Sequence, residues 1–159
     1  MMMAKASSAL RPPTTAAHPR RIYQAGTFST ARDREVHLEL NTRLVRAGHT
    51  VDWAPNFFSP AELDKASIET VNKLISTRIR AALEHAEAMV VILDCIRFDD
   101  GTPWEMGYAA ARNLPVYALT TDVLRIHTDT VLSVGNILQA ATITETAHTL
   151  DELLRLING

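Results

Sequence analysis

Short apolar runs alternate with longer amphipathic stretches through most of this 159-residue chain. The apolar runs have the length and β-branched content of strands, and they lie at 21–25, 49–53, 89–94 and 115–120, with a short fifth candidate at 141–144. Helical spacing fills the gaps, at 31–47, from 59 to about 87 with a break near Ser67, at 106–113 and after Thr149. Because such alternation favours parallel strands joined by helices, we expect an α/β three-layer sandwich. It would hold a single, mostly parallel sheet of about four to five strands, of the flavodoxin or Rossmann type.

The composition is that of one globular domain preceded by a short extension. Residues 1–20 are rich in Ala, Ser, Thr and Pro and lack apolar periodicity, so we expect a disordered N-terminal extension and a single domain over 21–159. The extension is basic and free of acidic residues, a pattern that also resembles an organelle transit peptide. No apolar run approaches the roughly 18 residues of a membrane span, which favours a cytoplasmic protein without a membrane partner.

Charge and motif content argue against several classes of site. Residues 1–21 carry four basic and no acidic residues, which leaves 12 basic and 18 acidic residues in the remainder. An acidic body argues against binding of nucleic acid. The single cysteine, Cys95, rules out a cysteine metal cluster, and the histidines lack metal-ligand spacing. The turn at Gly26 matches neither a dinucleotide fingerprint nor a Walker loop. We therefore expect no metal and no organic cofactor.

The stretch 99–107, Asp-Asp-Gly-Thr-Pro-Trp-Glu-Met-Gly, carries most of the chemistry. It follows the buried strand predicted at 89–94 and precedes the helix predicted at 106–113. Ligands of open α/β sheets bind beyond the carboxyl ends of such strands. Three carboxylates, those of Asp99, Asp100 and Glu105, fall within seven residues there.

Two interpretations of Glu105 are open. In the first, Thr102 is an N-cap, Pro103 is the first helical residue, and Glu105 completes a capping box. In the second, Glu105 is a nucleophile whose ionised form is favoured by the helix dipole. Its like charge would then keep Asp99 or Asp100 protonated, as a proton donor. Such a pair of carboxylates can cleave a glycosidic bond with retention.

The chain resembles the nucleoside 2-deoxyribosyltransferases in several of these segments. Leu93-Asp94, residues 99–107 and the Ala-rich stretch 109–116 are similar to that family's D-D-G-(S/T)-x-x-E-(hydrophobic)-G-x-A pattern with its following helix and strand. Residues 22–28, Ile-Tyr-Gln-Ala-Gly-Thr-Phe, are similar to its first strand and glycine turn. The resemblance covers roughly 21–157, in order. The resemblance favours the interpretation of Glu105 as a nucleophile, and a capping role for Glu105 is compatible with it.

The resemblance implies a transfer of 2-deoxyribose between nucleobases, with a 2′-deoxynucleoside and a free nucleobase as partners. Glu105 would attack C1′ of the sugar with retention, and Asp99 would protonate the leaving base. The other expected substrate-binding residues are Tyr23, Gly26, Thr27, Phe28, Asp100, Gly101 and Asn136. Asn136 would hold the sugar in a neighbouring subunit's site, which implies a homo-oligomer, a dimer or higher, with shared sites. Asn136 as a plain turn residue, and Phe28 as a core residue, stay open alternatives.

One position departs from the family's pattern. Ile79, between Arg78 and Arg80, stands near where the family usually carries an Asp or Asn that helps to hold the base. The change indicates either a different base preference or an arginine recruited for a phosphate. A hydrolase of nucleoside 5′-monophosphates is therefore the first alternative, with phosphate candidates at Thr27, Ser29, Thr30, Arg78 and Arg80. A non-catalytic nucleotide-binding module is the second. The paired aromatics Phe57 and Phe58 would form a pocket wall, a lid or a subunit contact.

Overall fold

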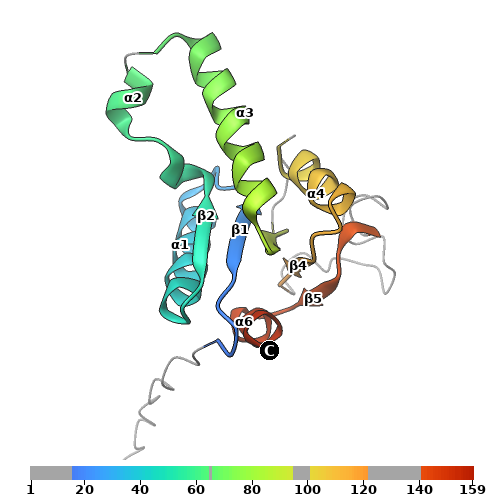
Figure 1. The fold of residues 1–159 in the computed structure, drawn as a ribbon. Helices are drawn as coiled ribbons and strands as arrows, with labels where there is room; N and C mark the ends of the chain where they lie inside the picture. The colour runs from blue at the N-terminus through green and yellow to red at the C-terminus, as the bar shows by residue number, and fades with distance from the viewer. Residues whose placement is uncertain (1–15, 65, 95–100, 122–140) are drawn as a thin grey trace, which may run out of the picture.

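A computed structural model describes residues 16–64, 66–94, 101–121 and 141–159. Five parallel strands form one sheet in the order β2-β1-β3-β4-β5 (Figure 1). Their bounds are β1 (Arg21–Gly26), β2 (Thr50–Trp53), β3 (Ala88–Ile92), β4 (Val116–Leu119) and β5 (Glu145–Ala147). The strand order reverses between β1 and β3, which creates the crevice where ligands bind in such sheets. The predicted fold is confirmed.

Alternating residues of the strands build a core on each face of the sheet. Ile22, Val90 and Leu119 pack against α1 (Ala31–Arg46) and α6 (Leu150–Asn158). The neighbours of these residues along the strands face the other way. Tyr23 and Met89 are among them, and they pack against α3 (Ile68–His85) and α4 (Gly101–Ala111). Both faces of the parallel sheet are thus covered by helices, as this sheet type requires.

Gly26 closes β1 in a conformation that only glycine adopts easily. Its φ is +131°, and a Cβ there would lie 2.7 Å from the carbonyl oxygen of Ile92 and 3.1 Å from the ring of His37. The ends of β1 and β3 therefore approach each other closely. The chain then leads into α1, whose N-cap Thr30 forms a capping box with Asp33.

The long helical stretch after β2 is broken where the sequence predicts it. The 3₁₀ turn η1 (Ala54–Phe57) leads into the short α2 (Pro60–Asp64), and Ser67 caps the separate α3. In Figure 1, α2 and the beginning of α3 stand clear of the sheet. The predicted apolar stripe of α3 is buried only at Ala82 and Leu83, while Ile68 is 82% exposed.

Two local predictions are wrong. The fifth strand is 145–147 rather than 141–144, because pairing with β4 selects the segment that lies alongside it. Helix α4 begins at Gly101, so Thr102 is inside its first turn rather than at its N-cap. Within the described part of the chain, no helix has the length and apolar content needed to cross a membrane.

Candidate active site

Glu105 projects from the first turns of α4 toward the end of β1. The residue is 9% exposed, and its Oε1 accepts a hydrogen bond of 2.7 Å from the hydroxyl of Tyr23. Tyr23 is fully buried on the face of β1 that packs against α4. A hydrogen bond to a carboxylate is stronger than one between neutral groups, so this contact fixes the orientation of the Glu105 side chain.

The Glu105 carboxylate borders a cavity of about 350 Å³, a size suited to a small organic ligand. Four segments line it: the end of β1, the segment after β2, one side of α3 and the start of α4. The lining residues are Tyr23, Gln24, Ala25, Gly26, Phe28, Trp53, Ala54, Pro55, Phe58, Ile75, Ile79, Gly101, Thr102 and Glu105. Most of these are apolar, so the described part of the lining places the Glu105 carboxylate against a largely hydrophobic wall.

A group of three aromatic rings, of which His37 and Trp53 are buried, supports one side of this cavity. The ring of His37 stacks on Trp53, with centroids 5.6 Å apart and planes at 10°. Phe28 meets both rings edge-on, at 6.2 and 6.3 Å. Trp53 and Phe28 line the cavity, whereas His37 lies behind them.

The side chain of Gln24 fixes His37. Its amide nitrogen lies 2.9 Å from the carbonyl oxygen of His37 and 3.0 Å from His37 Nδ1. Because the amide donates to the carbonyl, its nitrogen is assigned, and Nδ1 is the acceptor. Burial lowers the pKa of His37, which keeps the ring neutral.

Sequence reasoning treated His37 as one of several scattered histidines and missed this role. A signal was present, because His37 lies three residues before Leu40 and seven before Leu44, on the buried face of α1.

Most of the predicted site residues that the structure describes meet at this cavity. Tyr23, Gly26, Phe28, Gly101 and Glu105 all line it. Thr27 is buried between two of the lining residues. Asp99, Asp100 and Asn136 lie outside the described residues, so their expected roles stay predictions.

Some of the phosphate candidates are engaged with the protein itself. The hydroxyl of Thr30 accepts a hydrogen bond from the backbone of Asp33. The guanidinium of Arg78 pairs with Glu62 at 2.9 Å, while Arg80 is exposed on α3. In the described ranges, no group of three His, Cys, Asp or Glu side chains could hold a metal ion.

Comparison with known families adds an independent line of evidence. The family model described as nucleoside 2-deoxyribosyltransferase matches residues 22–151. The chain belongs to the nucleoside 2-deoxyribosyltransferase family. Membership indicates an enzyme that acts on nucleosides, as a transferase or a glycosidase. No curated protein matches this chain closely enough in sequence to count as a relative.

Several solved structures share the fold of this family member. A conserved protein from Enterococcus faecalis V583 has a TM-score of 0.67 and 19% identity, over 87% of this chain and 99% of that one. A 2-deoxyribosyltransferase from Bacillus psychrosaccharolyticus has a TM-score of 0.67 and 20% identity, over 83% and 88%. The CMP N-glycosidase BcmB from Clostridium botulinum has a TM-score of 0.52 and 17% identity, over 86% and 97%. At these identities, the likeness establishes the fold.

Proposed function

We propose that this protein transfers 2-deoxyribose from a 2′-deoxynucleoside to a free nucleobase through a covalent intermediate on Glu105. The observation that carries the proposal is the Glu105 carboxylate, held by Tyr23 at 2.7 Å on the border of an apolar cavity. Family membership supports a reaction at the glycosidic bond. The apolar lining suits the flat faces of a base, and the carboxylate suits attack on the sugar.

The reaction proceeds in two displacements. In the first, a Glu105 oxygen bonds to C1′ as the bond from C1′ to the base nitrogen breaks, and Asp99 gives its proton to the leaving base. In the second, the nitrogen of the incoming base attacks C1′ from the side opposite the ester. The bond between C1′ and the Glu105 oxygen breaks as the new bond to nitrogen forms, and Asp99 takes a proton from the incoming base. Two inversions leave the configuration of C1′ retained.

Tyr23 has a different effect in each displacement. Its hydroxyl donates to a carboxylate in the free enzyme and to a neutral ester in the intermediate. The hydrogen bond is stronger with the charged oxygen, so it stabilises Glu105 as a leaving group in the second step. It also holds the carboxylate in one position for the first step.

The cavity favours transfer over hydrolysis. A hydrophobic wall excludes water from the ester until a base arrives, which protects the intermediate. A nucleoside 5′-monophosphate would instead call for a cation near the sugar. Arg78 is paired with Glu62, and the described cavity lining contains no lysine or arginine. These observations support an uncharged nucleoside as the donor.

We also propose a homo-oligomer in which Asn136 of one chain completes the partner's site. A closed two-fold interface exchanges such contributions reciprocally. Mixed oligomers of Glu105→Ala and Asn136→Ala chains would then contain an undamaged site. Under random dimerisation they should regain up to about a quarter of the wild-type activity. No regain of activity would place Asn136 in its own chain's site, and an Asn136→Ala chain that is fully active by itself would place Asn136 outside any site.

The test of the proposed function is a base exchange. The protein is incubated with 2′-deoxyinosine and adenine, and with 2′-deoxyinosine 5′-monophosphate in a parallel sample. Chromatography should show 2′-deoxyadenosine, formed faster than free 2-deoxyribose. Release of free sugar or sugar phosphate in an amount that added adenine does not change would favour the hydrolase instead.

A further inference from the structure

The segment 54–58 forms one side of the cavity. Ala54, Pro55 and Phe58 line the cavity, η1 contains no buried residue, and the partly buried Phe57 packs against the core. The N-cap of η1, Trp53, supplies no side-chain hydrogen bond. Contacts with a neighbouring helix add to the packing of Phe57.

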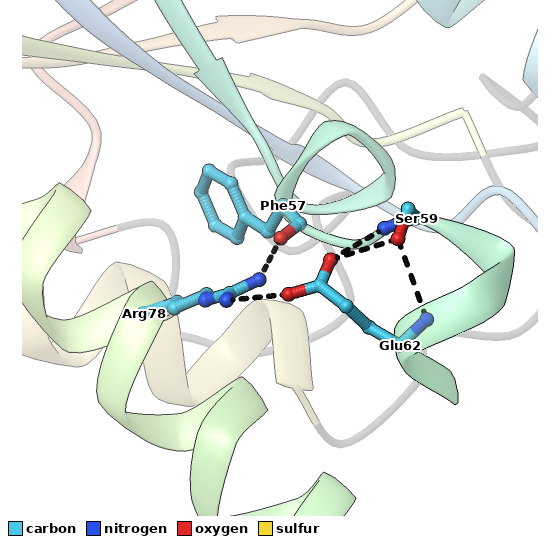
Figure 2. Close-up of polar contacts among 4 residues, drawn as sticks. All are labelled: Phe57, Ser59, Glu62 and Arg78. Carbon is cyan, nitrogen blue, oxygen red and sulfur yellow. Dashed lines mark hydrogen bonds and ion pairs between the residues drawn. The ribbon is translucent and has the colours of Figure 1, made fainter. Parts of the chain in front are cut away.

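Arg78 of α3 supplies those contacts (Figure 2). One guanidinium nitrogen donates to the carbonyl oxygen of Phe57, and another donates to Glu62 Oε1 at 2.9 Å. The guanidinium carbon also lies 4.7 Å from the centroid of the Phe58 ring. A planar guanidinium can bond two acceptors and stack on a ring at once, which a lysine cannot do.

Glu62 is itself fixed on the other side, as Figure 2 also shows. Its Oε2 accepts from the backbone nitrogen of Ser59 at 2.9 Å and from the Ser59 hydroxyl at 3.1 Å. The Ser59 backbone and Arg78 lower the pKa of Glu62 to about 2, so its charge persists at every pH used for assays. Ser59, Glu62 and Arg78 thus form a continuous link from α2 to α3.

The link ends on α3, which supplies another part of the cavity lining. Ile75 and Ile79 are the lining residues of this helix, and Ile79 is the residue next to Arg78. Arg78 therefore joins the Phe58 wall to the Ile75 and Ile79 wall. The side chains of Arg78 and Glu62 are 34% and 45% exposed, so solvent screens the pair and it adds little stability. Its effect is on position.

We propose that Arg78 is a positioning residue that fixes Phe58 relative to Ile75 and Ile79 in the base subsite. The inference rests on the proposed function, because it assumes that the apolar part of the cavity receives a nucleobase. The subsite recognises the flat faces of the base. The arginine beside Ile79 acts on the protein wall rather than on a phosphate.

Binding of two nucleosides tests the proposal without turnover. Dissociation constants for thymidine and 2′-deoxyinosine are measured by calorimetry in a Glu105→Gln background, with Arg78→Met or Arg78→Lys added. Arg78→Met should raise the dissociation constants of both nucleosides by about tenfold. Arg78→Lys, which keeps one contact, should raise them by less. Arg43→Met is the matched control, since Arg43 also pairs with two carboxylates, Glu39 on its own helix and Asp151 on α6, but does not line the cavity. It should change binding by less than about twofold.

Two further measurements separate positioning from general damage. In the active chain, Arg78→Met should raise KM for the nucleoside by more than it lowers kcat. Amide hydrogen exchange over 54–62 should become faster in Arg78→Met and stay unchanged in Arg43→Met. Glu62→Gln, on the exposed side of the link, should shift binding in the same direction by a smaller factor.

The outcomes distinguish the two proposals. If the nucleoside dissociation constants of the Arg78→Met and Arg43→Met chains differ by less than about twofold, the positioning role is overturned. If the wild-type chain binds nucleosides but transfers no deoxyribose, only the proposed function is refuted. The dissociation constants of the Arg78→Met and Arg43→Met chains then still decide the role of Arg78. If the Glu105→Gln parent binds neither nucleoside, the base subsite itself is overturned.

Discussion

The hydroxyl of Tyr23 and the carboxylate of Glu105, 82 residues apart in the chain, are joined by a hydrogen bond of 2.7 Å. A second pair in the protein has the same chemistry, because Tyr108 donates to Glu84 Oε1 at 2.9 Å. The second pair lies on the outer sides of α3 and α4 and lines no part of the cavity. Tyr108 therefore serves as a control for Tyr23, and Glu84 serves as a control for Glu105.

Glu105→Gln should abolish most of the activity while the fold persists. The amide keeps the size of the side chain and an oxygen for Tyr23, but it cannot form the ester. We expect a loss of at least about 10³-fold in kcat with a small change in stability. The matched Glu84→Gln should keep wild-type kcat. Chromatography of exchanged bases measures the rate, and thermal unfolding checks the fold. Near-normal turnover by a folded Glu105→Gln chain would show that Glu105 is not the nucleophile.

Tyr23→Phe should have a smaller effect. The substitution leaves the buried ring in place and removes the donor to Glu105, so the carboxylate is held less firmly and is a poorer leaving group. We expect kcat to fall by about 10- to 100-fold. Tyr108→Phe should leave kcat unchanged. Single-turnover kinetics can show whether breakdown of the intermediate is slowed more than its formation. Equal kcat values for the two variants would mean that the contact has no part in catalysis.

Gly26→Ala should destabilise the protein more than Gly48→Ala. Both glycines have positive φ, at +131° and +103°, so each substitution strains the backbone. At Gly48 the nearest atom to a new Cβ is 3.9 Å away, whereas at Gly26 the Ile92 carbonyl oxygen would be at 2.7 Å. We expect a loss of about 1 kcal/mol in the free energy of unfolding at Gly48 and roughly 3 kcal/mol at Gly26. Urea unfolding measures both, and losses of equal size would contradict the close approach of β1 and β3.

Acid should weaken the folded state through His37. Its folded pKa lies below the ordinary histidine value of about 6.5, because burial disfavours the charged ring. Below about pH 6.5 the unfolded chain gains a proton that the folded chain does not, so the free energy of unfolding falls as the pH falls. The decline stops once the pH is below the folded pKa as well. The attraction of Asp33 offsets only part of the effect of burial.

The pH dependence can be assigned by substitution. His37→Gln should flatten the decline of unfolding free energy between pH 7 and the acid range, although it also removes the stack on Trp53. His18→Gln, at an exposed position, should leave the decline unchanged. Urea unfolding at several pH values gives the slopes. A slope that is the same with and without His37 would show that the ring is not the responsible group.

The sequence predicts the layered fold because the apolar runs and the helical spacing are local signals. It places the strands within one or two residues and predicts the break near Ser67. It misplaces β5, whose residues Glu145–Ala147 have little strand propensity and are selected by pairing with β4. Helical spacing alone does not show that Ile75 and Ile79 line the cavity, and only the resemblance to a family places Ile79 near the base-binding position.

The site is predictable where its residues share one segment. The strand-to-helix turn brings out Glu105, and the resemblance to a family adds Tyr23 and Gly26. The contacts of Arg78 and the position of His37 behind Trp53 are not predictable in this way, because they join segments far apart in the chain. The departure from the family's pattern at Ile79 suggests either a different base preference or an arginine recruited for a phosphate. Only the folded arrangement shows that Arg78 bonds Phe57 and Glu62.

Trapping of the covalent intermediate tests the central claim most directly. The protein is mixed with a 2′-deoxy-2′-fluoroarabinosyl nucleoside, whose fluorine destabilises the oxocarbenium-like transition state and slows breakdown of the ester. After acid quenching, mass spectrometry should find one sugar on the peptide that contains Glu105, and none in the Glu105→Gln chain. Base release at full rate with no sugar on the protein, or with the sugar on another residue, would contradict the account.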